Sequence, residues 1–238
     1  MNKFAVFDID GTLIRWQLFH TVVNRLAKAG CLGSEASKII KQDMMTWKTR
    51  QNNDAFHDYE HQLVKIYHQQ LTNIKLTIFD KIIDEVFEEY KDQTYIYTKN
   101  LAKALKDEGY KLFIVSGSQV ELVIKIARYY GFDDYVGMEY QRGEKNFTGK
   151  IITNSIDKEL ALKNLITKHN VITKGSLAIG DTKSDIPMLR LVDQPIAFNP
   201  NQILYDEAIK NSWQIVVERK NVTYQLRQIN GQYVLGKF

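Results

Sequence analysis

The feature that most constrains this chain is an apolar run at residues 4–7, which is followed at once by two aspartates. Four consecutive apolar residues are too few for a helix and suit a buried strand. Asp8 and Asp10 are two positions apart, so in an extended backbone their side chains emerge on the same side. Gly11 then allows the backbone to turn. The sequence therefore predicts a buried strand that ends in a pair of neighbouring carboxyl groups.

The close spacing of Asp8 and Asp10 indicates what the pair can do. Two like charges held near one another raise the pKa of at least one of the two groups. The pair is tolerated if a cation neutralises it, or if one carboxyl is protonated while the other is ionised. A carboxylate nucleophile beside a carboxylic acid and a hard divalent metal ion is suited to phosphoryl transfer. A calcium loop is excluded, because residues 13–16 supply none of the further oxygen side chains that such a loop needs.

Composition excludes several other classes of protein. The chain has 238 residues, of which 44% are hydrophobic, enough for a large core and a smaller insert. It has no apolar run near the roughly 20 residues that cross a membrane, and its start does not resemble a signal peptide. The one cysteine, Cys31, forms no internal disulfide, which predicts a cytoplasmic location. The net charge of +4 is scattered, which favours a small anionic substrate over nucleic acid and leaves the oligomeric state open.

The order of apolar patterns predicts a core interrupted by an insert. Residues 17–90 show apolar side chains at three- and four-residue spacing and no strand signal, as expected for successive helices. Later apolar runs read as strands at 111–116, 175–180 and 194–198. Helical patterns alternate with these strands, which predicts a parallel sheet with helices on both faces. We therefore predict an α/β fold, with a doubly wound, Rossmann-like parallel sheet (residues 1–16 and 91–238) and an inserted α-helical cap domain (17–90).

For two segments the sequence predicts a structure but no function. Residues 135–152 contain three glycines separated by extended residues, which suggests a small hairpin. The tail from Trp213 to Phe238 reads as a last strand followed by a hairpin that turns at Asn230 and Gly231. An edge hairpin and a contact with a partner both remain open for this tail.

Polar residues follow the predicted strands where ligands gather in sheets of this kind. Ser116 and Gly117 end the strand at 111–116, and backbone N–H groups in such a turn can cradle phosphate oxygens. Asp181 and Asp185 follow the strand at 175–180 and lie one helical turn apart. One of these two carboxylates can bind a metal ion while the other holds a water on the metal or a lysine.

Together these segments resemble the haloacid dehalogenase superfamily of phosphohydrolases. Residues 8–13 (DIDGTL) resemble its first motif, and the turn at Ser116 and Gly117 resembles its second. Residues 180–185 (GDTKSD) resemble the fourth motif. The matches follow the family's order. The long helical insert, and the residues TGK at 148–150, resemble the subclass that includes phosphoserine phosphatase.

The resemblance implies a magnesium-dependent phosphomonoester hydrolase that acts on a small phosphorylated metabolite. Asp8 would attack phosphorus and form an aspartyl phosphate. Asp10 would protonate the leaving oxygen and then activate water. The Mg²⁺ ligands implied are the carboxylates of Asp8 and Asp181 and the backbone carbonyl of Asp10, with Asp185 in the same acidic set.

The family also has a lysine at the start of a helix, and Lys158 occupies that place here, with Lys150 and Lys163 as weaker alternatives. Its ammonium group would offset charge on the nucleophile and on the phosphate. Ser116, the Gly117 N–H and Lys158 would then stabilise the phosphate oxygens.

Two positions depart from the phosphoserine phosphatases and leave the substrate open. Gln17 stands where those enzymes have a glutamate that reads the substrate's amino group, and Ser184 stands where they usually have asparagine. Arg50, in the insert, is a candidate for contact with a carboxylate or second phosphate. A phosphotransferase that uses the same aspartyl phosphate, and a non-catalytic phospho-ligand-binding protein, are the alternatives to a hydrolase.

Overall fold

The computed structural model describes residues 2–52, 55–153, 157–229 and 231–236. The chain divides into two compact units. We call the first the core unit; it comprises Met1–Trp16, Tyr90–Met138 and Asn154–Phe238. We call the second the helical unit; it comprises Gln17–Glu89 and Glu139–Thr153.

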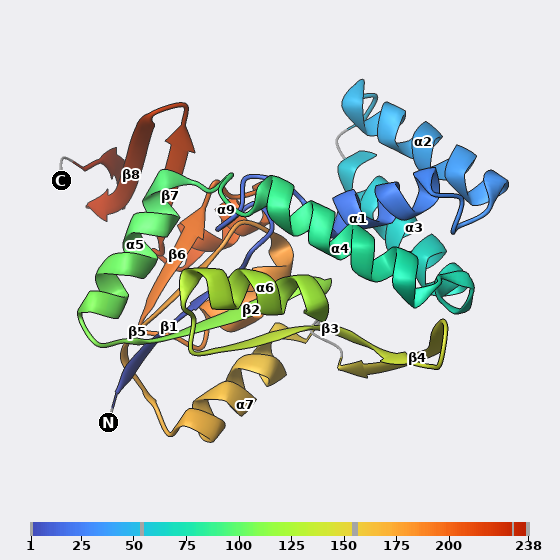
Figure 1. The fold of residues 1–238 in the computed structure, drawn as a ribbon. Helices are drawn as coiled ribbons and strands as arrows, with labels where there is room; N and C mark the ends of the chain where they lie inside the picture. The colour runs from blue at the N-terminus through green and yellow to red at the C-terminus, as the bar shows by residue number, and fades with distance from the viewer. Residues whose placement is uncertain (1, 53–54, 154–156, 230, 237–238) are drawn as a thin grey trace. The chain divides into compact units, whose positions relative to one another are not determined.

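The core unit is built on a sheet whose neighbouring strands are, in order, β3, β2, β1, β5, β6, β7, β8 and β9 (Figure 1). The strands are β1 (Lys3–Phe7), β2 (Lys111–Gln119), β3 (Asp134–Arg142), β5 (Ile172–Gly180), β6 (Gln194–Phe198), β7 (Gln214–Arg219), β8 (Val222–Ile229) and β9 (Gln232–Leu235). Pairing is parallel from β3 through β7 and antiparallel for β8 and β9. The predicted tail hairpin is thus present as β8 and β9, although Asn230 lies outside the described residues.

Helices cover both faces of this sheet, and the alternation of side chains along β1 shows how. Ala5 and Phe7 face a buried cluster that includes residues of α5 (Ile96–Asp107). Phe4 and Val6 face the opposite cluster, to which three other helices of the core unit contribute. Those helices are α7 (Lys158–His169), α8 (Ile186–Leu189) and α9 (Gln202–Lys210). The predicted doubly wound α/β class is therefore confirmed.

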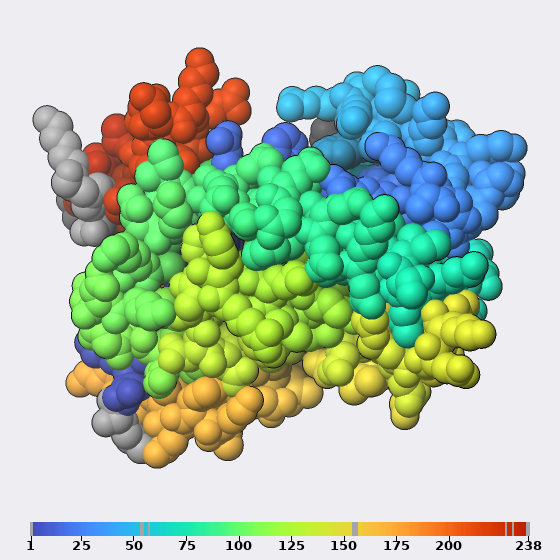
Figure 2. Space-filling model, in the orientation of Figure 1, coloured from blue at the N-terminus to red at the C-terminus, as the bar shows by residue number. Residues whose placement is uncertain are grey.

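On the α5 side, α6 (Val120–Tyr130) packs against β2. In the space-filling view the atoms of α5 and α6 cover the central strands (Figure 2). The helix ends at Gly131, whose φ of 68° is the left-handed conformation that ends many helices. The end of α6 is thus determined locally by the sequence.

The helical unit contains α1 (Leu18–Lys28), α2 (Ser34–Lys48), α3 (Ala55–Gln70), a 3₁₀ turn η1 (Leu71–Asn73) and α4 (Leu76–Tyr90). It also contains the end of β3 and its antiparallel partner β4 (Phe147–Thr153). The Tyr140 hydroxyl lies 3.0 Å from His68 Nε2, and Arg142 donates to Asp80 over 2.6 Å. These contacts tie the hairpin to α3 and α4. The sequence indicated the hairpin but not its grouping with the helices, and the 17–90 boundary of the insert stays a prediction.

Within the part of the chain that the structure describes, no helix combines the length and the apolar character needed to span a membrane.

Candidate active site

The first loop of the core unit begins where β1 ends. The Asp8 N–H donates to the Ile179 carbonyl over 3.1 Å, so Asp8 still lies within the sheet. Gly11 has a φ of 76°, a conformation that glycine adopts without strain, and the N–H groups of Thr12, Leu13 and Ile14 all donate to the Ile9 carbonyl. This tight turn places Asp8 and Asp10 at the carboxyl end of the central strand.

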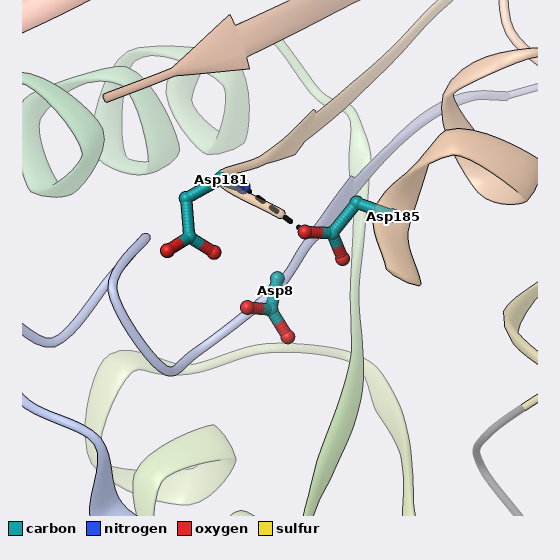
Figure 3. A group of neighbouring side chains, drawn as sticks. All are labelled: Asp8, Asp181 and Asp185. Carbon is teal, nitrogen blue, oxygen red and sulfur yellow. Dashed lines mark hydrogen bonds between the residues drawn. The ribbon is translucent and has the colours of Figure 1, made fainter. Parts of the chain in front are cut away.

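Three carboxyl groups meet at this edge of the sheet, those of Asp8, Asp181 and Asp185 (Figure 3). Each offers an oxygen within 4.8 Å of the oxygens of the other two. Asp8 follows β1 and Asp181 follows β5, the parallel neighbour of β1, so the sheet itself brings these two residues together. Asp185 ends the 3₁₀ turn η2 (Lys183–Asp185).

Asp185 holds the backbone and a lysine in place. Its Oδ2 accepts hydrogen bonds from the N–H groups of Asp181 (3.0 Å; Figure 3) and Thr182 (2.9 Å). Its Oδ1 accepts from Lys158 Nζ over 2.6 Å. Both oxygens of this fully buried carboxylate are therefore engaged by the protein.

Lys158 joins Asp185 to Asp8. Its Nζ lies 2.7 Å from Asp8 Oδ1, and the lysine and Asp8 are each 4% exposed. Lys158 begins α7, whose N-terminus is capped by Asp157, which accepts from the Leu160 N–H over 2.9 Å. The cap fixes the start of the helix and with it the origin of the lysine side chain.

The alternatives to Lys158 do not share this environment. Lys163 lies on the exposed side of α7 and pairs with Glu159 one turn earlier, and Lys150 is exposed in β4 of the helical unit. Among the three lysines, the structure brings only Lys158 to the carboxyl cluster.

Burial and mutual repulsion shift the protonation equilibria of the cluster. Burial raises the pKa of Asp8 to about 8, helped by the charges of Asp185 and Asp10 and opposed by Lys158. Burial likewise raises the pKa of Asp181, and the neighbouring Asp185 and Asp8 add to it. Burial lowers the pKa of Lys158, but the Asp185 and Asp8 carboxylates outweigh it and leave that pKa raised.

Asp10 occupies a different environment from Asp8. Its Oδ2 accepts from Ser118 Oγ over 2.5 Å and lies 3.4 Å from Ser116 Oγ. Both serines are fully buried. Ser116 is thus brought to the carboxyl pair, and its hydroxyl faces Asp10. The predicted end of the strand at 116 is wrong, because β2 continues to Gln119 and contains both Ser116 and Gly117.

Two contributors to the site were not predicted. Thr12 is fully buried and its Oγ1 lies 3.3 Å from Asp181 Oδ1, and Ser118 contacts Asp10. A signal for Ser118 existed, because Ser116 and Ser118 are two positions apart on one strand and so face the same side. For Thr12 the sequence offers no comparable signal.

The specificity candidates lie in the helical unit. Gln17 is the N-cap residue of α1, and its side chain makes no capping hydrogen bond. Arg50 is exposed after the end of α2, with a φ of 51°. Their part in substrate selection stays a prediction.

The absence of a side chain at Gly180 is a requirement of the site. A Cβ at this position would lie 2.5 Å from Asp185 Cβ and 2.6 Å from its Oδ2, within a fully buried side chain that has no room to move. We expect Gly180→Ala to lower the free energy of unfolding by about 1–3 kcal/mol and to reduce activity, because Asp185 is displaced from Lys158. Urea unfolding and turnover measure the two effects.

The matched control for Gly180→Ala is Gly117→Ala. A Cβ there has no heavy atom within 4 Å, and we expect a change in unfolding free energy below about 0.5 kcal/mol. Equal destabilisation by the two substitutions would contradict the steric account.

Comparison with known proteins supports a family assignment. The family model for haloacid dehalogenase-like hydrolases matches residues 5–190. A phosphoserine phosphatase of Archaeoglobus fulgidus is 24% identical over 210 residues, covering 87% of this chain and 55% of that protein. A histidinol-phosphatase of Neisseria meningitidis serogroup C is 24% identical over 232 residues, covering 91% and 99%. The chain spans about half the length of the first curated relatives that it matches.

A solved structure titled as a phospho-aspartyl intermediate analogue of phosphoserine phosphatase shares the fold, with a TM-score of 0.65 and 21% identity, covering 92% of this chain and 94% of that one. The family match includes the strand before Asp8, Ser116, Lys158 and the acidic pair at Asp181 and Asp185. This chain belongs to the haloacid dehalogenase-like hydrolase family.

Proposed function

We propose that this protein is a Mg²⁺-dependent phosphomonoester hydrolase that works through an aspartyl phosphate on Asp8. The observation that carries the proposal is the contrast between two neighbouring carboxyl groups. Asp8 is buried against the ammonium group of Lys158, whereas Asp10 is held by seryl hydroxyls. Carboxyl groups placed in different environments can take the different roles of nucleophile and acid–base catalyst.

The chemistry runs in two displacements at phosphorus. An Asp8 oxygen forms a bond to phosphorus as the ester P–O bond breaks, and the Asp10 carboxyl gives its proton to the departing oxygen. A water molecule then loses a proton to the Asp10 carboxylate and attacks phosphorus. The bond from phosphorus to Asp8 breaks, which releases inorganic phosphate and restores both aspartates.

The charge on the described residues fits a divalent cation. The carboxyl groups of Asp8, Asp181 and Asp185 cluster beside the ammonium group of Lys158, and the charge of Asp10 also acts on Asp8. Their donors are hard oxygens of the kind that Mg²⁺ prefers. Asp8, Asp181 and the Asp10 carbonyl would hold the ion, while Asp185 at the edge of the set holds Lys158. When bound, Mg²⁺ neutralises charge on the phosphoryl oxygens and orients them.

Three residues are proposed to bind the phosphate. Ser116 offers a hydroxyl, Gly117 offers a backbone N–H at an exposed position of β2, and Lys158 offers positive charge beside the nucleophile. Preorganised donors of this kind stabilise the charge that develops in the transition state.

The substrate proposed is a small phosphorylated metabolite. The names of the curated relatives, phosphoserine phosphatase and histidinol-phosphatase, support this class. Those two relatives have different substrates at nearly the same identity to this chain, so neither substrate is favoured by similarity. Gln17 and Arg50 are the candidates for reading the part of the substrate beyond its phosphate.

The proposal is tested by phosphate release from a panel of phosphomonoesters, in Mg²⁺ and in chelator. The panel contains phosphoserine, histidinol phosphate, phosphoethanolamine, phosphocholine, sugar phosphates, nucleotides and p-nitrophenyl phosphate. We expect Mg²⁺-dependent release that Asp8→Asn abolishes, which excludes a contaminating phosphatase. Phosphate transfer to an added alcohol with little release to water would replace the hydrolase by the phosphotransferase. If neither phosphate release nor phosphate transfer were detected with any compound of the panel, the proposal would be contradicted.

A further inference from the structure

The hydroxyl of Ser118 lies at hydrogen-bond distance from the carboxyl group to which we assign acid–base catalysis. Ser118 Oγ is 2.5 Å from Asp10 Oδ2, whereas Ser116 Oγ is 3.4 Å from the same atom. The Ser118 N–H donates in turn to Ser116 Oγ over 3.1 Å. Of the two hydroxyls, that of Ser118 is therefore the closer partner of Asp10.

The backbone holds Ser118 in this position. The pairing of β2 with β3 shifts its register between Val115 and Gln119, and such irregularities redirect the side chains within them. Gly137 of β3 permits close packing behind this segment. A Cβ on Gly137 would lie 3.1 Å from the Ser118 carbonyl oxygen and 2.9 Å from Val120 Cα. The backbone around Ser118 therefore has little freedom to move.

Burial strengthens the contact. Ser118 is fully buried, so water does not compete for its hydroxyl, and a hydrogen bond to a carboxylate in such a place is both short and directional. Both seryl hydroxyls donate to Oδ2 of Asp10, and that of Ser118 is the closer. An oxygen that accepts these hydrogen bonds is the less suitable one to carry the transferable proton.

We propose that Ser118 is a positioning residue for Asp10, and that its hydrogen bond to Oδ2 aligns the other carboxyl oxygen for proton transfer to the leaving group. The role rests on the proposed function, because it presupposes Asp10 as the acid of a phosphomonoester hydrolase. It assigns to Ser118 a part in leaving-group departure and none in binding the phosphate.

The test compares leaving groups. A p-nitrophenolate leaving group departs without a proton, whereas a phenolate or alkoxide leaving group needs one. Because kcat/KM reports the steps up to departure of the leaving group, misaligned Asp10 should lower kcat/KM only for the second kind of substrate, even though Asp10 also activates water in the later step. In Ser118→Ala we expect kcat/KM for p-nitrophenyl phosphate to change less than about 3-fold and that for phenyl phosphate to fall about 10- to 100-fold. Ser118→Thr keeps a hydroxyl and is expected to recover most of the loss.

The matched control is Ser176→Ala. Ser176 is also a fully buried serine in a core strand, and its hydroxyl donates to the Thr173 carbonyl, away from the carboxyl cluster. We expect it to leave the ratio between the two substrates unchanged. If Ser118→Ala does not fold, Ser118→Cys, which keeps the shape and weakens the donor, replaces it in the same comparison.

The outcomes separate this role from the proposed function. If Ser118→Ala lowered kcat/KM equally for p-nitrophenyl phosphate and phenyl phosphate, or for neither, the positioning role would be overturned. The proposed hydrolase activity would be unaffected by that result. Wild-type protein that hydrolyses neither of these two esters nor any other phosphomonoester of the panel in Mg²⁺ would overturn the proposed function, and the role of Ser118 with it.

Discussion

The Asp8→Asn variant is expected to lose turnover of every phosphomonoester by at least about 10³-fold. Its amide is nearly the same size as the carboxyl group, so the core around β1 is preserved, but it cannot act as the nucleophile. The loss should appear in kcat and persist at saturating Mg²⁺ and substrate. Rates of phosphate release under those conditions measure it, and a variant that keeps more than a few per cent of wild-type turnover would exclude Asp8 as the nucleophile.

The same variant has a distinct effect on stability, measured in chelator. Because burial raises the pKa of Asp8 from 3.8 to about 8, the folded protein resists ionising this group. Its contribution to stability is therefore fully present below about pH 4 and is lost as the pH rises through about 8. The amide introduced by Asp8→Asn does not titrate in this range. The difference in unfolding free energy, variant minus wild type, should therefore increase as the pH rises from about 5 to about 8. If urea unfolding gave free energies for the two proteins that differ by the same amount at every pH, the raised pKa of Asp8 would be contradicted.

The second large effect is expected from Lys158→Met. Lys158 is the one ammonium group that the structure places on both Asp8 and Asp185, and all three side chains are buried. Removing the lysine from its buried ion pair with Asp185 leaves an uncompensated charge and lowers the unfolding free energy by about 3–5 kcal/mol. We expect this loss near neutral pH in chelator, together with loss of turnover in Mg²⁺.

Lys163→Met is the matched control for Lys158→Met, since it makes the same change on the same helix. Lys163 pairs with Glu159 at the surface, where such pairs contribute little, and we expect a change below about 1 kcal/mol and unaltered turnover. If urea unfolding gave similar losses for both variants, the buried ion pair would not have the importance assigned to it.

Features that depend on neighbouring residues could be predicted from the sequence. The strand predicted at 194–198 is present as β6, and Lys158 begins α7 as predicted. The end of α6 at Gly131 is likewise determined by local sequence. Each follows from a short apolar run, a glycine or a capping aspartate. The carboxyl pair at Asp8 and Asp10 belongs to the same group, because the apolar run at 4–7 directly before it predicts the strand at whose end both residues lie.

Contacts between distant parts of the chain could not be predicted in this way. The grouping of the β3–β4 hairpin with the helices depends on pairs such as Tyr140 of β3 with His68 of α3, which are 72 positions apart. The bond from Ser118 to Asp10 joins residues 108 positions apart. The spacing of Ser116 and Ser118 indicates that they face the same side of a strand, but not that either meets Asp10. Each of the two contacts depends on how the strands and helices are stacked.

The central claim, a covalent intermediate on Asp8, is tested most directly by trapping it. Wild-type protein is mixed with a phosphomonoester that it turns over and Mg²⁺, quenched in acid during turnover, digested and mapped by mass spectrometry. The account predicts a phosphoryl group on the peptide that contains Asp8, absent from Asp8→Asn. Turnover without any covalent phosphate, or a phosphoryl group on another residue, would contradict it.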